Sequence, residues 1–390
     1  MTTFLKKIKY WAKNFLKFEK NYFVVGGNYK SLKYFFSQGN ILRHIEDRIK
    51  FRIYPLLRII PEFPTHIDIE PASQCQMRCA MCYTTYMDGS IKGVMKWDLF
   101  KSIIDQCAER RVYSVRLSWR GESLLNKQLL KMLAYAKSKG FKEVAFLTNA
   151  ELITEDIAEK LVDIGVTWIS ISADGTDEVY EEIRAPAKFS QTVQKVAMIK
   201  SIRQKKNKPF PLLRVQSLQS AAAVNLKRFY AAWENVVDRI NLISDEVRDF
   251  TKFEDSDYDH LYFCDRPWTR LTIAHDGRVH NCVADYSGSY ILGDANHEKL
   301  EDIWHGQRAN FARQAFVRND YYKTLPPCRT CSRGLKMTDS IKIDVAGNKT
   351  ESKRYINIEP LVRSDGYVTV KVPEGLLTAK IKKARGLRGS

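Results

Sequence analysis

Short apolar runs alternate with longer stretches of helical periodicity through the middle of the chain. The runs are rich in β-branched residues and predict six strands, at Thr65–Ile69, Ser114–Ser118, Glu143–Leu147, Trp168–Ser172, Leu212–Gln216 and Arg239–Ile243. The stretches between them repeat apolar residues three or four positions apart and predict helices near Lys96–Arg110, Lys127–Lys139, Glu155–Ile164, Phe189–Arg203 and Asn225–Trp233. This rhythm indicates parallel strands joined by right-handed crossovers.

Six such units predict an α/β fold with a partial (β/α)6 TIM-type barrel over residues 61–254. Six units cannot close an eight-unit barrel, so we expect an open, curved parallel sheet. The loops at the carboxyl ends of its strands are then the expected place for the functional site.

Residues 1–60 predict an α-helical N-terminal extension that is amphipathic and basic. Its first part places four apolar residues at helical spacing among lysines, namely Phe4, Ile8, Trp11 and Phe15. A second helical segment is predicted from about Ser31 to Ile60, and Pro61 and Pro64 end it. We expect the apolar stripe to pack on the barrel or to lie on an acidic membrane surface.

Beyond the barrel the pattern changes twice. Residues 255–335 predict a small C-terminal domain of short strands and turns, with one helix around Leu300–Phe316. Residues 336–390 predict a tail with strand-like runs such as Tyr367–Val372 and a basic end. The chain therefore divides into an extension, a barrel, a small domain and a tail.

Composition adds a limit on the environment and a hint about partners. The 390 residues are 44% hydrophobic and carry a net charge of +18, which suits a folded protein that attracts phosphates, acidic lipids or nucleic acid. No uncharged stretch is long enough for a signal peptide or a transmembrane segment. We expect a cytoplasmic protein, peripheral at a membrane at most, in which clustered thiols hold metal and do not form disulfides.

Three of the eight cysteines follow the first predicted strand directly. Cys75, Cys79 and Cys82 lie within eight residues. A 4Fe-4S cluster can take three thiolates from such a loop and leave its fourth iron open. A structural zinc site needs a fourth protein ligand, and His66 is the only histidine nearby. The spacing favours the cluster.

Four further cysteines lie in the predicted small domain: Cys264, Cys282, Cys328 and Cys331. Four thiolates close a metal site, and this spacing suits either zinc or a second cluster. The eighth, Cys107, shares a helical face with Phe100, Ile103 and Ile104 and is expected to be a buried apolar residue.

The first cysteine set resembles the fingerprint of the radical S-adenosylmethionine (radical SAM) superfamily, in which three cysteines are spaced three and then two residues apart after the first barrel strand. In that family an aromatic or apolar residue precedes the last cysteine, and Met81 takes this place here. The resemblance implies that Cys75, Cys79 and Cys82 hold a 4Fe-4S cluster and that Met81 lies beside the bound S-adenosylmethionine.

The resemblance continues at the ends of the next strands. The segment from Trp119 to Ser123 resembles the family's Gly-Gly-Glu-Pro motif, which meets the amino group of the cofactor's methionine; Gly121 and Glu122 match, and Arg120 and Ser123 depart from the pattern. Further polar residues follow the third and fourth strands. The resemblance implies a cofactor-binding role for Gly121, Glu122, Ser123, Asn149, Ser172 and Arg184, with Thr148, Ser170 and Asp174 pointing to the same face.

The second cysteine set resembles the auxiliary-cluster extension called SPASM, in the shorter form called twitch. The resemblance is carried by Cys264-Asp-Arg-Pro-Trp, Asp276-Gly277, Cys282, Leu292-Gly293, Ile303-Trp304 and Cys328-Arg-Thr-Cys331. It implies a second 4Fe-4S cluster, and zinc is the alternative.

The resemblance implies reductive cleavage of S-adenosylmethionine, with electrons from an external flavodoxin or ferredoxin, and hydrogen abstraction from a substrate. We expect a small-molecule or glycan substrate, namely a sugar or nucleotide-linked sugar that is oxidised or epimerised. Residues 1–60 do not predict the winged-helix domain common in peptide-modifying relatives, the single auxiliary cluster resembles that of relatives acting on small alcohols, and the basic charge suits an acidic substrate.

Two alternatives stay open. One is a peptide-modifying enzyme of the same superfamily. The other is a zinc-stabilised nucleic-acid- or membrane-binding protein, motivated by the +18 charge, although the barrel rhythm disfavours it and a nucleic-acid partner with it. No motif identifies a catalytic acid, base or hydrogen donor.

Overall fold

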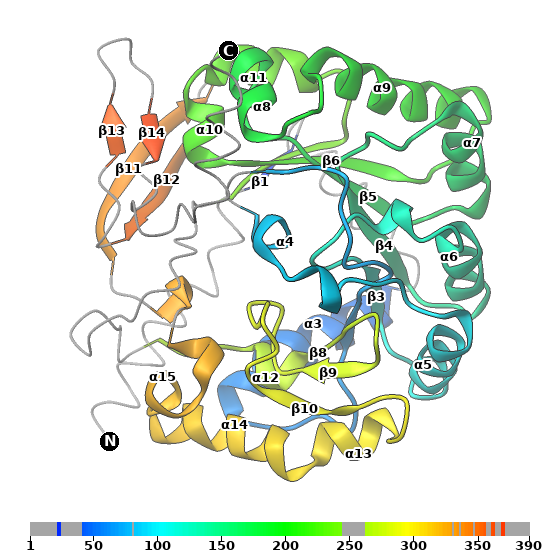
Figure 1. Ribbon diagram of the computed structural model, residues 1–390, viewed down its shortest axis with the longest axis vertical. Helices are drawn as coiled ribbons and strands as arrows, with labels where there is room; N and C mark the ends of the chain where they lie inside the picture. The colour runs from blue at the N-terminus through cyan, green and yellow to red at the C-terminus, as the bar shows by residue number, and fades with distance from the viewer. Residues whose placement is uncertain are drawn as a thin grey trace.

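The structure is a computed structural model that describes residues 22–24, 41–79, 82–243, 262–329, 331–334, 337–345, 348–355, 360–362 and 368–370. Its main element is a ten-stranded sheet with the strand order β1-β7-β6-β5-β4-β3-β2-β8-β9-β10. The sheet curves through the centre of the molecule, with helices along its outer side (Figure 1).

The six predicted strands form the parallel part of this sheet. They are β2 (His66–Ile69), β3 (Ser114–Leu117), β4 (Glu143–Thr148), β5 (Trp168–Ser172), β6 (Leu212–Leu218) and β7 (Arg239–Ile243). Each pairs in parallel with its sequence neighbour. The prediction of a partial (β/α)6 barrel is therefore confirmed.

The five predicted helices are also present and cover the outer side of the sheet (Figure 1). They are α5 (Trp97–Glu109), α6 (Leu129–Ser138), α7 (Glu155–Ile164), α9 (Phe189–Lys205) and α11 (Leu226–Trp233). Three short helices lie in the loops at the carboxyl ends of the strands, at α4 (Tyr83–Tyr86), α8 (Asp177–Ile183) and α10 (Gln219–Ala223).

Local sequence signals set the helix ends, as α7 illustrates. The hydroxyl of Thr154 accepts a hydrogen bond from the amide of Ile157 at the N-terminus. Gly165 ends the helix with φ 69°, a left-handed conformation that glycine adopts without steric cost. Thr154 and Gly165 therefore fix the helix between two neighbouring strands.

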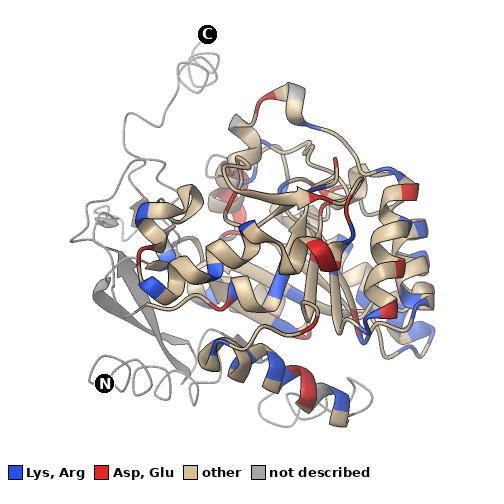
Figure 2. Cartoon of the chain, turned by 90° about the horizontal axis from the view of Figure 1, so that it is seen from below, with Lys and Arg blue, Asp and Glu red and all other residues tan. Residues whose placement is uncertain are grey.

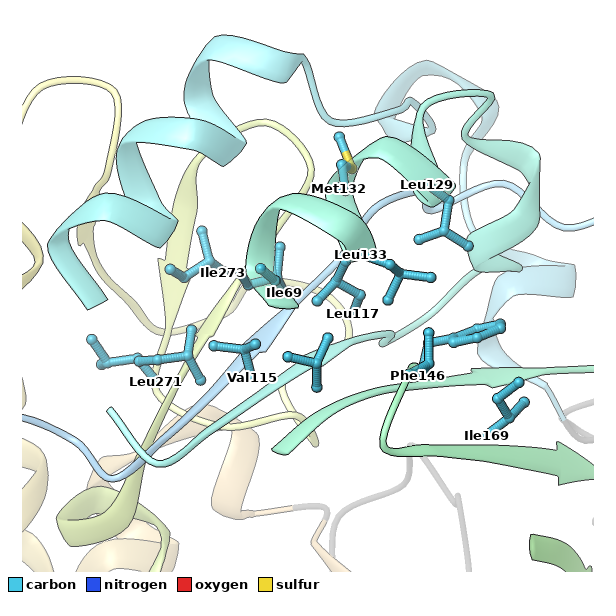
Figure 3. Close-up of a cluster of buried hydrophobic side chains, with 14 of the residues drawn as sticks. Ile69, Val115, Leu117, Leu129, Met132, Leu133, Phe146, Ile169, Leu271 and Ile273 are labelled. Carbon is cyan, nitrogen blue, oxygen red and sulfur yellow. The ribbon is translucent and has the colours of Figure 1, made fainter. Parts of the chain in front are cut away.

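The outer face of the sheet carries the apolar core. Figure 3 shows side chains of β2, β3, β4, β5 and β8 gathered against α6, whose Leu129, Met132 and Leu133 pack onto them. The strand residues in this layer are Ile69, Val115, Leu117, Phe146, Ile169, Leu271 and Ile273, all buried. Each Å² of apolar surface removed from water contributes about 25 cal/mol, so this layer stabilises the fold.

The concave face of the sheet is polar by contrast. Because side chains alternate across a strand, the residues between the apolar ones point inward. In β6 the even-numbered positions, which include Arg214 and Gln216, are partly exposed, and the odd-numbered ones are buried. Neighbouring strands place Asp68 beside Arg116, and Gln216 beside Asn241. The inside of the barrel is therefore lined with hydrogen-bonding and charged groups.

The small C-terminal domain adds three strands to the barrel sheet, a pairing that the sequence pattern does not predict. Strand β8 (Arg270–Ile273) pairs in parallel with β2, and β9 (Arg278–His280) and β10 (Ile291–Asp294) extend the sheet in antiparallel fashion. The two units thus share one continuous sheet.

Short helices complete this domain. They are α12 (Arg266–Thr269), α13 (Leu300–His305), α14 (Gln307–Arg318) and α15 (Tyr321–Thr324), followed by the turns η4 (Pro326–Cys328) and η5 (Ser332–Gly334). The single helix predicted around Leu300–Phe316 is two helices, because Gly306 has an extended conformation, with ψ 163°.

The N-terminal extension is helical only in part among the residues that the structure describes. Helix α3 (Ile41–Leu57) matches the second predicted helix, but β1 (Tyr22–Val24) is a strand that pairs antiparallel with the outer strand β7. An unpaired sheet edge exposes backbone polar groups, and β1 satisfies part of this edge. The stripe of Phe4, Ile8, Trp11 and Phe15 lies outside the described residues.

The tail contains two hairpins, β11 (Met337–Val345) with β12 (Asn348–Tyr355), and β13 (Pro360–Val362) with β14 (Val368–Val370). Strand β14 falls within the predicted run Tyr367–Val372. Lys and Arg positions recur along the outer helices, interspersed with acidic ones (Figure 2). Within the described ranges, no helix has the length and apolar character needed to cross a bilayer.

Candidate functional site

The loop that carries Cys75, Cys79 and Cys82 runs from the end of β2 to α4 and packs against the loop after β3. The amide of Glu122 donates a hydrogen bond to the carbonyl of Gln74 at 2.8 Å. A side chain at Gly121 would meet that carbonyl oxygen at 2.3 Å and the carbonyl oxygen of Ala72 at 2.4 Å. Gly121 is therefore required for the cysteine loop to lie where it does.

Glu122 connects this loop to the end of β4. Its carboxylate accepts hydrogen bonds from the Thr148 hydroxyl and the Asn149 amide, each at 2.8 Å. Burial raises the pKa of Glu122, although these donors oppose the change. The Asn149 side chain in turn accepts from the Gln76 amide at 3.1 Å, and its Nδ2 lies 3.8 Å from the Cys75 sulfur. Glu122 and Asn149 thus position the first cysteine.

The three thiols of this loop lie close enough for their charges to interact, with Cys79 buried and Cys75 and Cys82 partly buried. Burial raises the pKa of Cys75 to about 12 and that of Cys79 to about 11. The charges of the neighbouring thiols raise both further, as expected for sulfur atoms grouped closely. A positive centre shared by all three would remove this repulsion and stabilise the thiolate forms. The donor set therefore fits a thiolate-bound metal group.

Arg184 supplies positive charge beside these thiols. Its guanidinium binds one carboxylate oxygen of Asp174, through Nε at 2.9 Å and Nη2 at 2.6 Å. Burial would lower the pKa of Arg184, but Asp174 and the Cys79 thiol outweigh burial and raise it. The neighbouring carbonyl of Ala185 accepts from the amide of Arg78 at 3.0 Å, which fixes the cysteine loop to this segment.

Arg120, where the sequence departs from the family's glycine, forms a buried ion pair. Its Nε and Nη2 each lie 2.7 Å from one carboxylate oxygen of Glu70, and both side chains are almost fully buried. His275 adds hydrogen bonds to Glu70 from its amide at 3.2 Å and its ring Nδ1 at 3.1 Å. Burial would raise the pKa of Glu70, but Arg120 and His275 outweigh burial and lower it to about 2.

The same arginine connects the barrel to the small domain. Arg120 Nη1 donates to the carbonyl of Tyr286 at 3.0 Å, and the Tyr286 ring stacks on Tyr83, which follows Cys82. The indole of Trp119 donates to the carbonyl of Val283 at 2.8 Å. The segment after Cys282 is therefore held against the first cysteine loop.

The four cysteines of the small domain line a single cavity. Cys264, Cys282, Cys328 and Cys331 form its sulfur-bearing wall, together with aromatic residues and the arginines Arg266 and Arg333. They come from the segments before α12, after β9 and around η4, which are separate in sequence. Among the described residues, no three metal-ligating side chains converge on a single ion.

The chemistry of this cavity suits four thiolates around a metal group. Burial raises the pKa of Cys264 to about 12 and that of Cys328 well above its usual value, and the neighbouring thiols raise both further. Arg266 is partly buried, and the Cys282 and Cys264 thiols help to raise its pKa against the effect of burial. Its Nη1 has no hydrogen-bond partner within the described part of the chain. The thiol donors and the nearby cation fit an anionic four-thiolate centre.

The other predicted site residues differ in their surroundings. The Ser123 hydroxyl is buried and donates to the carbonyl of Leu117 at 2.8 Å, so it closes the turn after β3. Ser172 is half-buried on the concave face, beside Gln216 of the next strand. Ser170 accepts from Arg214 Nε at 3.0 Å. Met81 lies outside the described residues.

Sequence reasoning missed the inward-facing charges of the barrel. Glu70 follows directly on β2, and its partners Arg120 and His275 are 50 and 205 residues away. Asp68 binds Arg116 and Arg270 from two different strands. Only the alternation of apolar and charged residues in His66–Ile69 and Ser114–Leu117 signals that these charges share a face.

Two family models match the chain. Residues 69–212 match the radical SAM superfamily, and residues 264–332 match SPASM, an iron-sulfur cluster-binding domain. The first match covers the strands β3 to β5 and the first cysteine loop, and the second spans all four cysteines of the small domain. The two domains imply 4Fe-4S clusters and S-adenosylmethionine as cofactors.

Individual relatives match over part of their length. The Fe-coproporphyrin III synthase of Methanosarcina barkeri is 30% identical over 28% of this chain and 27% of its own. The subtilosin biosynthesis protein AlbA of Bacillus subtilis is 25% identical over 35% of this chain and 30% of its own. This chain thus matches less than a third of either relative.

Among solved structures, SuiB of Streptococcus suis bound to S-adenosylmethionine has a TM-score of 0.51 at 14% identity. The alignment covers 76% of this chain and 78% of that one. At this identity the likeness concerns the fold, and it agrees with the barrel and the small domain described above.

Proposed function

Because this chain belongs to the radical SAM superfamily and carries an iron-sulfur cluster-binding SPASM domain, we propose that it abstracts a hydrogen atom from a polar small molecule, a sugar or nucleotide-linked sugar, which it oxidises or epimerises. The observation that carries the proposal is the pairing of the two cysteine sets. Three thiols lie at the mouth of the barrel and four line one cavity, and Arg120 joins the two regions.

When bound, a reduced 4Fe-4S cluster with an open iron supplies the electron that cleaves S-adenosylmethionine to methionine and a 5'-deoxyadenosyl radical. We assign Cys75, Cys79 and Cys82 to this cluster. Gly121 and Glu122 hold their loop in place, and Asn149 lies against the Cys75 sulfur.

Arg184 is the residue we assign to the carboxylate of S-adenosylmethionine. Its side chain is 15% exposed, its charge acts on the Cys79 thiol, and a guanidinium can bind a carboxylate through two parallel hydrogen bonds. Asp174 holds it through a single carboxylate oxygen, which leaves part of the guanidinium for a second partner. Asp174 itself accepts from the amide of Leu218 at 2.7 Å, so the pair is fixed to the end of β6.

The concave face supports a polar substrate. Ser170, Ser172, Gln216 and Asn241 line it with hydroxyl and amide groups, and Asn241 Nδ2 donates to Gln216 Oε1 at 3.2 Å. Ser172 and Gln216 are the partly exposed members of this set, and an apolar substrate that covered them would cost about 1 to 3 kcal/mol for each polar group left without a partner. A carbohydrate offers a matching set of hydroxyls. A peptide is the second candidate within this superfamily.

The first test is cleavage of S-adenosylmethionine by anaerobically reconstituted, dithionite-reduced protein. We expect 5'-deoxyadenosine and about eight irons per chain, from two four-iron clusters. Replacement of Cys75, Cys79 and Cys82 by alanine should halve the iron and abolish cleavage. The matched control is Cys107→Ala, a buried cysteine outside both sets, which should change neither value. A triple variant that still cleaved the cofactor would refute the mechanism.

The second cysteine set is tested in the same assay. Replacement of Cys328 and Cys331 by alanine should also remove about four irons while 5'-deoxyadenosine is still formed. Product from the true substrate should be lost. If this variant kept its full iron content, the cavity would not hold a cluster.

Substrate class is tested with deuterium-labelled sugars, nucleotide-linked sugars and peptides. Label transferred from a sugar into 5'-deoxyadenosine supports the proposal. Transfer from a peptide alone would contradict the substrate class and leave the radical mechanism intact.

A further inference from the structure

Two arginines on the concave face of the barrel share one buried carboxylate. Asp68 of β2 is 2% exposed, and its Oδ1 lies 2.8 Å from Arg116 Nη2. Its Oδ2 lies 3.3 Å from Arg270 Nη1. One negative charge thus faces two positive charges in a place where water screens little. The two arginines and Asp68 together therefore carry a net positive charge inside the barrel.

A third arginine increases this excess. Arg266 lies in α12, directly before β8, and its charge acts on both Asp68 and Arg270. Burial lowers the pKa of Arg270, and the charges of Arg266 and Arg116 lower it further against the opposing effect of Asp68. Like charges held together at this cost are typical of sites that bind an opposite charge.

The arginines also have hydrogen-bond donors to spare. The Nε atoms of Arg116 and Arg270 and the Nη1 atom of Arg266 are buried and have no hydrogen-bond partner among the described residues. The hydroxyl of Thr272, which lies beside Asp68 in the sheet, has none in the described region either. A buried donor without a partner costs about 1 to 3 kcal/mol, so a ligand that accepts from all four is favoured.

The side chains of the two arginines that bind Asp68 are not fully enclosed. The side chains of Arg116 and Arg270 are 26% and 15% exposed, although the carboxylate between them is almost fully covered. Arg266 follows Cys264 by two residues and lines the cavity of the four cysteines. The cluster therefore extends from the barrel interior towards the auxiliary site.

We propose that Arg116, Arg270 and Arg266 bind a phosphoryl group of the substrate. Asp68 and Asp265 offset two of the three positive charges, and a phosphoryl group, which carries up to two negative charges, is attracted by the remaining excess and accepts from guanidinium forks through its oxygens. The inference rests on the proposed function, because it names the anionic part of the substrate that function requires. Asp68 orients two of the arginines and limits their affinity for anions.

The test measures anion binding by isothermal titration calorimetry, on holoenzyme with both clusters and saturating S-adenosylmethionine. Inorganic pyrophosphate is the probe, and malonate is the carboxylate comparison. We expect Arg116→Gln and Arg270→Gln each to weaken pyrophosphate binding by about 10- to 100-fold, the loss of one charge-assisted interaction. Arg228→Gln is the matched control, since Arg228 binds Asp177 through two hydrogen bonds on the exposed surface.

The variant Asp68→Asn distinguishes an effect on anion binding from a structural role of Asp68. It removes the competing carboxylate and keeps its shape, so pyrophosphate should bind several-fold more tightly than to the wild type. A purely structural role for Asp68 predicts no such gain. Iron content measured in parallel verifies that each variant is folded and loaded.

Three results would overturn the inference: equal pyrophosphate affinity in Arg116→Gln and Arg228→Gln, malonate binding more tightly than pyrophosphate, or loss of pyrophosphate binding when S-adenosylmethionine is present. The last would assign the arginines to the cofactor. Formation of 5'-deoxyadenosine by the wild type tests the proposed function separately, so the failure of one is distinguishable from the failure of the other.

Discussion

Replacement of Arg120 by methionine should destabilise the protein. It should also reverse how the contribution of Glu70 to the free energy of unfolding depends on pH. Glu70 and Arg120 are almost fully buried and joined by two hydrogen bonds of 2.7 Å. The pKa of Glu70 falls from 4.5 to about 2, which corresponds to about 3 kcal/mol of stability at neutral pH. Because the folded pKa lies below the unfolded one, this contribution is present above about pH 4.5 and is lost as the pH falls towards 2.

In Arg120→Met the carboxylate of Glu70 keeps only His275. Burial then dominates and raises the pKa of Glu70 above its unfolded value. The contribution of Glu70 to stability is therefore lost as the pH rises and not as it falls. At neutral pH we expect a loss of about 3 to 5 kcal/mol, the usual cost of an unpaired buried charge. The double variant Glu70→Leu/Arg120→Met removes both charges and should recover about 2 kcal/mol of this.

The assay is anaerobic urea unfolding of cluster-loaded protein, followed by tryptophan fluorescence at mildly acidic and mildly alkaline pH. Both the midpoint and the m-value are compared, because an altered m-value would indicate a change in the unfolding reaction itself. Arg110→Met is the control: Arg110 pairs with Glu301 on the exposed surface and should contribute under about 1 kcal/mol. An Arg120→Met protein within about 1 kcal/mol of wild type, or more stable at alkaline pH, would refute the reasoning.

Two further predictions concern the cofactor loops. Gly121→Ala places a methyl group 2.3 Å from the carbonyl oxygen of Gln74, so it should displace the cysteine loop, lower the iron content by up to half and abolish cleavage. The control Gly89→Ala, which has open space around it, should change neither value. A normal iron content in Gly121→Ala would contradict this prediction. Arg184→Lys keeps the charge but loses the planar fork, so cleavage should need about tenfold more S-adenosylmethionine at unchanged iron content, and an unchanged KM would remove Arg184 from the cofactor site.

The barrel could be predicted from the sequence because its signals are local. Each strand is a short apolar run, and the bounds of Trp168–Ser172 and Arg239–Ile243 agree to the residue. Capping residues such as Thr154 and Gly165 mark the helix ends in the same local way. These features need no knowledge of the rest of the fold.

The pairing of β8 with β2 could not be predicted in this way, because about 200 residues separate the two strands and a four-residue run carries little signal. The Glu70–Arg120 pair is equally hidden, since nothing near Glu70 in sequence indicates its partner. The cysteines are intermediate: their spacing indicates two sets, and only the fold brings Cys264 and Cys282 to the same cavity as Cys328 and Cys331.

The parallel pairing of β8 with β2 also determines how this chain can be divided. A truncated chain that ended before Cys264 would leave His66–Ile69 as an exposed edge strand. This strand would carry unpaired amide and carbonyl groups and two large aliphatic residues, Ile67 and Ile69. An exposed edge strand can pair with another copy of itself, so the isolated barrel should aggregate on expression. By covering the edge of β2, the small domain therefore also protects the barrel from aggregation. In chimeras of homologous proteins, β2 and β8 should come from the same parent.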